Sequence, residues 1–311
     1  MRNRLVIGFS LAATLLATGP THALLFRAYL ASNGSDANQC TLAQPCRLLP
    51  AAIAAVASGG EIWMLDSANY NSGTVTIGKS VSIRAVPGSV GSIVATGGGP
   101  AISITTGGLD VALRNVAIGP IAGGSDGTNG VEMTGASNLT IEDSVIAGVP
   151  GNAIYIVGTG SLRLAGTTLR KNGQYTVWLQ DGARGVITAT RMLDNTYNVI
   201  AYGHSAGTTT VATISDSVMS RGYYGAYAYV DVAATARISV ARCTIERTVF
   251  PIGSDAPFGG TTELNVGSSQ IVDNSNAWLQ SGAGGTLLSL GNNQMSGNGA
   301  PIGSKTSLAP Q

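Results

Sequence analysis

Aromatic residues in the middle of the chain are the first candidates for binding chemistry. They are Tyr155, Trp178, Tyr202 and Tyr229. Each lies next to a small or aliphatic residue in a short segment that suits a β-strand. Rings exposed in a row can stack against the apolar faces of sugar rings, while polar neighbours bind the sugar hydroxyl groups. A polysaccharide is therefore one ligand that this pattern predicts.

Three polar residues, Gln180, His204 and Asp231, follow Trp178, Tyr202 and Tyr229 by two positions each. His204 is the only histidine after residue 22. If the segments lie side by side, Asp231 can hold the His204 imidazole in one tautomer for acid or base catalysis. Three interpretations stay open: aromatic stacking that only stabilises strands, a glycan-binding surface, and a catalytic pair formed by His204 and Asp231.

A sequence repeat places these segments. The last apolar position of seven copies is Ile146, Leu169, Met192, Met219, Ile245, Ile271 and Met295, at spacings of 23 to 27 residues. Apolar residues also stand five and seven positions earlier; in the seventh copy these are Leu290 and Leu288. Alternation with a period of two predicts strands, and a repeat of this length predicts a solenoid whose coils stack about 4.8 Å apart.

Small polar residues recur at two further places in the repeat. Two positions before the last apolar residue stand Ser144, Thr167, Thr190, Ser217, Cys243, Ser269 and Asn293, and three positions after it stand Asn172, Asn195, Asn274 and Asn298. Such residues bond the backbone at bends and turns. We interpret both columns as structural, with Cys243 as a buried, serine-sized member rather than a catalytic thiol.

The N-terminus carries the features of a secretory signal peptide. Arg2 and Arg4 precede an apolar run over residues 5–17, and small residues lead to an expected cleavage after Ala23. The mature chain is then expected to be secreted or periplasmic, with attachment to the cell surface left open. In that oxidising setting we expect Cys40 and Cys46 to form a disulfide.

The expected domain boundaries follow from these patterns. Residues 1–23 form the signal peptide, 24–60 an N-terminal cap with the disulfide loop, 61–297 the β-helix and 298–311 a C-terminal tail. Within the cap, residues 50–57 are expected to form a short helix, because a proline begins them and Gly59-Gly60 follows them. Such a helix would cover the open first coil.

Charge and composition exclude several classes of partner. Without residues 1–23 the chain has 15 basic and 16 acidic residues, a net charge of −1. This balance favours neither nucleic acid nor insertion into a membrane after signal cleavage. No zinc-ligand spacing, phosphate-binding loop or dense set of calcium ligands is present in the sequence, so we expect neither a metal nor a cofactor.

Together the repeat and the segment from Arg27 to Ile62, with its cysteine pair and Ala-rich stretch, resemble the pectin-lyase-like superfold, and more narrowly the secreted bacterial right-handed β-helix repeat proteins. The resemblance spans nearly all of the mature chain. It implies an all-β fold, a right-handed parallel β-helix with a short N-terminal capping helix, and export. It implies no particular activity, because a fold does not determine function.

The enzymes that the superfold contains provide a test for catalysis. Polygalacturonase motifs are incomplete here: Asp194-Asn195-Thr196 and Gly203-His204-Ser205 are the nearest strings, and no Asp-Asp pair accompanies them. Acidic residues are scattered rather than gathered as in a pectate lyase. The leading hypothesis is an exported, noncatalytic protein that binds polysaccharide or serves as a surface or structural module. The alternative is a polysaccharide lyase or glycoside hydrolase.

Overall fold

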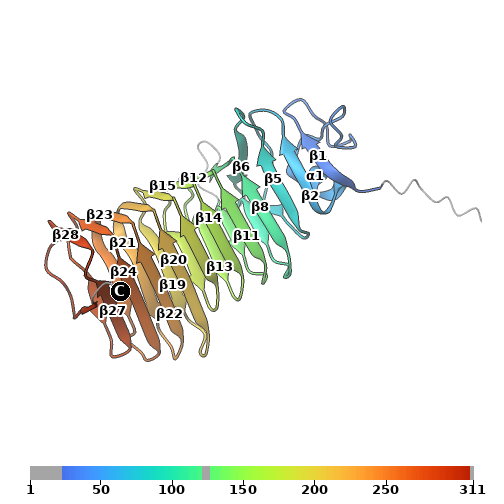
Figure 1. Cartoon of the computed structure of the whole chain (residues 1–311). Helices are drawn as coiled ribbons and strands as arrows, with labels where there is room; N and C mark the ends of the chain where they lie inside the picture. Colours follow the sequence, from blue (N-terminus) through green and yellow to red (C-terminus); the bar gives the residue numbers. More distant parts are fainter. Residues whose placement is uncertain (1–22, 121–126, 309–311) are drawn as a thin grey trace, which may run out of the picture.

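The computed structural model describes residues 23–120 and 127–308. In it the chain winds into an elongated prism of stacked coils (Figure 1). Every strand pairing among these residues is parallel, and each strand pairs with strands of neighbouring coils. The predicted all-β parallel β-helix is confirmed.

Two sheets form the walls of the prism. The first sheet, in spatial order, contains β1 (Leu25–Leu30), β2 (Val56–Met64), β5 (Val81–Ala85), β8 (Asp110–Arg114), β11 (Asn138–Glu142), β14 (Ser161–Ala165), β17 (Arg184–Thr188), β20 (Thr209–Ser215), β22 (Thr235–Ala241), β24 (Thr261–Gly267), β27 (Gly285–Leu290) and β29 (Thr306–Leu308). The buried apolar side chains of this sheet, such as Ile83, Ile141 and Ile214, point into the prism.

The second sheet bends, so that it supplies two walls. It contains β3 (Ala68–Asn69), β4 (Val75–Thr76), β6 (Gly91–Ala95), β7 (Ile102–Ile104), β9 (Val116–Pro120), β10 (Val131–Met133), β12 (Val145–Ala147), β13 (Ile154–Val157), β15 (Thr168–Arg170), β16 (Tyr175–Gln180), β18 (Arg191–Leu193), β19 (Tyr197–Gly203), β21 (Val218–Val230), β23 (Thr244–Asp255), β25 (Gln270–Val272), β26 (Leu279–Ser281) and β28 (Gln294–Ser296). The long strands β21 and β23 run through both walls.

The apolar columns align as the repeat predicts, except in its seventh copy. Ile146 pairs with Leu169, and the same column continues to Met295. In β27 the register is shifted by one residue. Leu287, rather than Leu288, continues the column of Leu264, and Ser289, rather than Leu290, continues the column of Val266. Leu288 and Leu290 form the more apolar alternation, but the pairing with β24 selects the register that buries Leu287 and Ser289.

Both polar columns bond the backbone of the adjacent coil. The Thr190 N–H donates to Ser217 Oγ at 3.1 Å, and the Asn172 N–H and Nδ2 both donate to Asn195 Oδ1 at 3.0 Å. Cys243 lies buried in its column, with its N–H donating to Ser269 Oγ at 3.2 Å. These bonds give partners to buried amides at several successive bends, so both columns have a structural explanation without a ligand.

Aspartates at the strand ends have a structural explanation too. Asp143, Asp194, Asp216 and Asp273 all adopt the left-handed backbone conformation, with φ between 49° and 55°. Aspartate tolerates this conformation better than most residues. Their recurrence therefore reflects the turn geometry of successive coils rather than a binding site for calcium.

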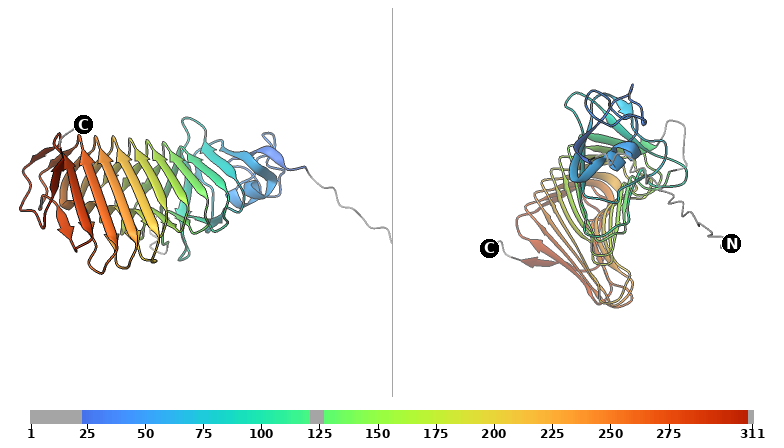
Figure 2. Two further views of the ribbon diagram at one scale, coloured as in Figure 1. Left: turned by 60° about the horizontal axis from the view of Figure 1, so that its bottom comes forward. Right: turned by 90° about the vertical axis from the view of Figure 1, so that its right-hand side faces the viewer.

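The N-terminal end is capped by a helix. Helix α1 (Leu49–Ala55) lies over the first coil and buries Leu49, Ala52 and Ile53 against it (Figure 2). It ends two residues earlier than predicted, because Val56 adopts an extended conformation and begins β2, which includes Gly59-Gly60. The predicted disulfide between Cys40 and Cys46 is present.

The sheet extends beyond the expected boundaries at both ends. Strand β1 lies in the region expected to be a cap and pairs with β2, and β29 lies in the expected tail and pairs with β27. The predicted signal peptide lies outside the described residues except for Ala23. Within residues 23–120 and 127–308, no helix has both the length and the hydrophobicity needed to cross a membrane.

Candidate functional site

Aromatic side chains gather on the outer side of β13, β16, β19 and the second halves of β21 and β23. We call this surface the aromatic face. Its rings are Tyr155, Tyr175, Trp178, Tyr197, Tyr202, Tyr223, Tyr224, Tyr227, Tyr229 and Phe250. Most are half-buried, because the rings cover one another. The face extends over several coils and is larger than the four aromatics that the sequence nominated.

The register of the strands separates the nominated aromatics into two rows, not the single row expected. Tyr155 pairs with Trp178, whereas Tyr202 pairs with Gln180 on one side and Tyr229 on the other. The inward residues Leu179, Ala201 and Ala228 do align and are buried. Trp178 comes directly before the inward residue Leu179 in its strand, whereas Tyr202 comes directly after the inward residue Ala201 in its strand. Trp178 and Tyr202 therefore lie in neighbouring rows.

A further row escaped sequence reasoning. Tyr224 pairs with Phe250, and the row continues through Tyr197 to Tyr175. Two consecutive residues of β16, Thr176 and Val177, are both buried. They break the alternation of period two that would have marked Tyr175 as an outward residue. The recurring spacing of three between Tyr175 and Trp178, and between Tyr224 and Tyr227, is the signal that could have found it.

Most rings of the aromatic face are stacked in parallel. Tyr224 and Tyr227 lie 4.0 Å apart with 5° between their planes, and Tyr227 and Tyr229 lie 5.6 Å apart with 14°. Tyr202 stacks on Tyr229 at 5.4 Å and 23°. A ring held between parallel neighbours has its faces covered, so it presents its edge and its hydroxyl group to a ligand.

Trp178 and Tyr155 differ from the stacked rings. Their planes are inclined by 62° to each other, and Trp178 is inclined by 63° to Tyr175 and by 48° to Tyr202. Among the described residues no ring lies parallel to either of them. The indole Nε1 of Trp178 is buried without a hydrogen-bond partner. The indole is therefore held by packing alone.

Polar side chains form a hydrogen-bonded network beside these rings. Tyr202 donates from its hydroxyl to Asp231 Oδ2 at 2.6 Å, and His204 Nδ1 lies 2.9 Å from the same oxygen. Because an ionised carboxylate only accepts, Nδ1 carries the hydrogen and Nε2 is left as the acceptor of the neutral ring. Both the predicted contact of His204 with Asp231 and a contact with Tyr202 are thus present.

Asp181 connects the network, through Gln180, to the inclined rings of Tyr155 and Trp178, which we call the turned rings. Its Oδ1 accepts hydrogen bonds from the backbone N–H groups of His204 and Ser205, both at 2.7 Å. Gln180 donates to Asp181 Oδ2 at 3.1 Å and accepts from the Tyr155 hydroxyl at 3.3 Å. Asp181, which sequence reasoning did not single out, therefore fixes the loop that carries His204.

Hydrogen bonds set the charge states in the network. Burial alone would raise the pKa of the Asp231 carboxyl, but the bonds from Tyr202 and His204 outweigh it and hold that pKa below its ordinary value. Burial, followed by the bond to Asp231, raises the pKa of the Tyr202 phenol far above its ordinary value. Near neutral pH Asp231 is a carboxylate and Tyr202 a neutral donor.

The described residues hold no evident metal centre. No group of three or more histidine, cysteine, aspartate or glutamate side chains within residues 23–120 and 127–308 is arranged to hold an ion. The carboxylates of Asp181 and Asp231 instead accept hydrogen bonds from protein donors.

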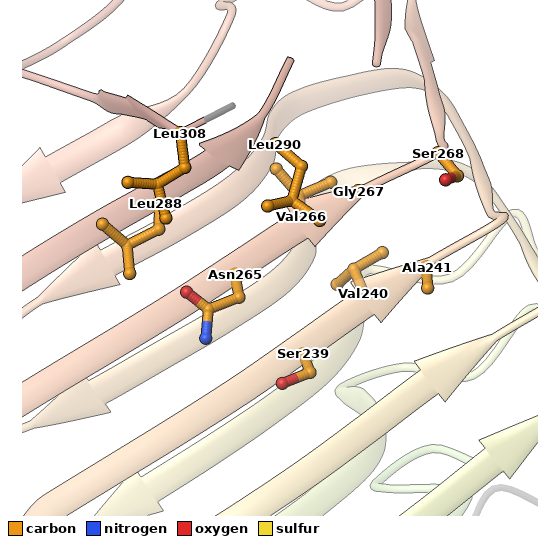
Figure 3. A pocket seen from close by; sticks show the side chains of 10 residues that line it. All are labelled: Ser239, Val240, Ala241, Asn265, Val266, Gly267, Ser268, Leu288, Leu290 and Leu308. Carbon is orange, nitrogen blue, oxygen red and sulfur yellow. The ribbon is translucent and has the colours of Figure 1, made fainter. Parts of the chain in front are cut away.

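A separate hollow of about 470 Å³ lies on the first sheet near the C-terminal end (Figure 3). Its walls include Leu288, Leu290 and Leu308, together with Ser239 and Asn265. No ionisable side chain lines it. It therefore offers apolar contact but no acid, base or nucleophile, and we do not assign the chemistry of the protein to it.

Comparison with known proteins supports the fold. No curated protein matches the sequence. The solved structure of pectate lyase Pel9A is similar with a TM-score of 0.63 and 13% identity, covering 91% of this chain and 78% of its own. The structure of XylC in complex with xylose is similar with a TM-score of 0.51 and 10% identity, covering 86% of this chain and 69% of its own. At such identities the likeness concerns the fold alone.

A family model described as the right-handed β-helix region matches residues 90–245, half of the chain. The match covers the middle coils of the prism, including those that carry Tyr155, Trp178, Tyr202 and Tyr229. It also confirms the predicted handedness of the coil. The chain belongs to the right-handed β-helix family.

Proposed function

We propose that this protein is an exported β-helix protein that binds polysaccharide without turning it over, and that the contact surface is the aromatic face around Trp178. One observation carries the proposal. Trp178, Tyr155 and Tyr223 are the rings of the face that no parallel ring covers among the described residues, and of these three Trp178 and Tyr155 lie beside the polar network. An indole that no parallel ring covers can stack on the apolar side of a sugar ring.

Polar groups near Trp178 suit sugar hydroxyls. The His204 side chain is 57% exposed, and its Nε2 makes no hydrogen bond within the described residues. Gln180 is half-buried and follows Trp178 by two positions on the same side of β16. Tyr202 and Tyr229 add phenol groups in the next row. A binding surface of this kind combines broad apolar contact with a few fixed polar groups.

A second candidate is a polysaccharide lyase or glycoside hydrolase, which the contact between His204 and Asp231 favours. Pel9A, whose fold is similar, is named a pectate lyase. In this candidate His204 would act as the base and Asp231 would orient it. A hydrolase further requires a carboxyl group that stays protonated to act as an acid. Asp231 does not suit that role, because its pKa lies below the ordinary value.

Binding and turnover assays separate the two candidates. Purified protein lacking residues 1–23 is incubated with a panel of neutral and acidic polysaccharides, while retention, new reducing ends and unsaturated products are measured. We expect binding without products. Trp178→Ala should weaken binding at least about tenfold, and Tyr202→Ala less.

The matched control is Tyr224→Phe, which keeps a ring that is stacked on both sides and should leave binding unchanged. If Trp178→Ala and Tyr202→Ala both bind as the unaltered protein does, the aromatic face is not the contact surface. Product formation that His204→Ala abolishes would establish the enzyme instead.

A further inference from the structure

The aromatic face carries negative charge that no arginine or lysine of its own balances. Four acidic residues lie at or beside the rows of rings: Glu132 on the adjacent strand β10, Asp181 just after β16, Asp231 just after β21, and Asp255 at the end of β23. The sequences of β10, β13, β16 and β19, and of residues 222–230 and 248–255, contain no lysine or arginine. His204 is the only side chain there that can become positively charged.

Neutral donors, rather than arginine or lysine, form the hydrogen bonds to these carboxylates, and Asp255 Oδ1 is buried without a partner among the described residues. Asp255 accepts a hydrogen bond from the Tyr227 hydroxyl at 2.9 Å, and Glu132 accepts one from Asn129 Nδ2 at 2.8 Å. Such bonds stabilise the charges without removing them. The negative field of the face therefore reaches a ligand that lies across the rings.

Nearby basic residues belong to other parts of the coil. Arg184 begins β17 in the first sheet, beyond the turn that follows Asp181. Arg221 and Arg247 directly precede the parts of β21 and β23 that carry the rings; Arg221 pairs with Asp194 at 2.6 Å, and Arg247 lies 3.9 Å from Glu246. None of these arginines lies in the rows of the aromatic face, so a carboxylate group bound within the rows would find acidic neighbours and no bidentate guanidinium partner.

We propose that the aromatic face binds an uncharged glycan and discriminates against polyuronates. The inference depends on the proposed glycan binding at Trp178, and it names the class of ligand. Each pair of like charges about 6 Å apart in water weakens binding by roughly threefold. A uronate chain that crosses several coils meets more than one such pair, which gives a difference of about tenfold or more at low ionic strength.

A single polymer in two charge states provides the test. Polygalacturonate with nearly complete methyl esterification is compared with the same preparation after de-esterification, because the two share backbone and length. Binding is measured at about 10 mM and at about 500 mM salt, with a chelator present; neutral xylan and glucan are further probes. We expect weaker binding of the de-esterified polymer, and a difference that narrows at high salt because salt screens repulsion.

Charge-neutralising variants show whether repulsion is the cause. Glu132→Gln combined with Asp255→Asn should raise binding of the de-esterified polymer severalfold and leave the esterified polymer unaffected. A difference that persists unchanged in this variant and at high salt would overturn the inference, since shape rather than charge would then be responsible. So would binding of the de-esterified polymer that calcium restores and Glu132→Gln removes.

The two proposals fail in different ways. If no neutral or charged polymer binds, or if Trp178→Ala has no effect on binding, the proposed function fails. If the de-esterified polymer binds as tightly as the esterified one at low salt, and Trp178→Ala still abolishes that binding, the protein binds glycans but the charge inference is wrong.

Discussion

The two ends of the aromatic face use similar residues in different ways. Tyr224, Tyr227 and Tyr229 form a parallel stack on β21, in which Tyr227 is only 6% exposed. Tyr155 and Trp178, on β13 and β16, lie edge to face instead. Parallel stacking covers a face of both rings of a pair, whereas an edge-to-face pair covers a face of only one of them. Stability is thus expected to depend on the stacked end and recognition on the turned end.

A glycine explains part of this difference. Tyr227 pairs across the strands with Gly253, and a Cβ atom at position 253 would lie 2.7 Å from Tyr227 Cδ2. The missing side chain lets the phenol ring lie over the neighbouring strand. In the same row, Trp178 pairs with Ile200, whose side chain occupies the equivalent space. The ring orientations thus follow from the residue on the next coil.

The largest expected effect is that of Tyr227→Ala. The substitution removes a buried ring with parallel neighbours on both sides, and we expect it to lower the free energy of unfolding by about 3–4 kcal/mol. Urea denaturation measures the loss. Glycan binding at the turned end, measured where the variant is still folded, should remain within about twofold. A large loss of binding would show that glycan binding depends on the stacked end as well as on the turned end.

Stacked coils made most of the fold predictable. Each residue of the column that ends in Met295 meets its equivalent on the next coil, so one copy of the repeat supports the assignment of another. The Asn172 and Asn195 ladder was predictable for the same reason. The prediction failed at Leu288 and Leu290 because these two leucines form the more apolar pattern, whereas the pairing with β24 places Leu287 and Ser289 at the inward positions.

The site was less predictable than the fold. The contact between His204 and Asp231 followed from adjacent coils, because both residues lie two positions after an aromatic of the same row. Trp178 does not belong to that row, because it precedes the inward residue Leu179 of its strand, whereas Tyr202 follows the inward residue Ala201. Ring orientation depends further on neighbours such as Gly253, which become adjacent only in the folded chain. No spacing along the sequence encodes that tilt.

Gly253→Ala gives the next largest effect, because the added methyl group must displace the Tyr227 ring. We expect a loss of about 1–3 kcal/mol in the free energy of unfolding. A double-mutant cycle supplies the control: in the Tyr227→Ala background the same substitution should cost much less, since the clash is gone. Additive losses would show that the glycine serves the backbone and not the ring.

Tyr227→Phe should cost less again. It keeps the stack and removes only the hydroxyl that donates to Asp255 at 2.9 Å, so we expect a loss of about 1 kcal/mol. Near-ultraviolet circular dichroism should stay close to that of the unaltered protein. A loss as large as that of Tyr227→Ala would mean that the hydrogen bond, rather than parallel stacking, stabilises this end.

The smallest effect concerns pH and the turned end. Because hydrogen bonds hold the pKa of Asp231 below its ordinary value, the ionised form favours the folded state. This contribution is complete above the ordinary pKa of about 3.9 and is lost as the pH falls through the lower, folded value. Water screens the partly exposed carboxylate, so we expect no more than about 0.5 kcal/mol. Urea denaturation at pH 7 and pH 3 should show a smaller decrease for Asp231→Asn than for the unaltered protein. Equal decreases would mean that this network positions His204 without stabilising the fold.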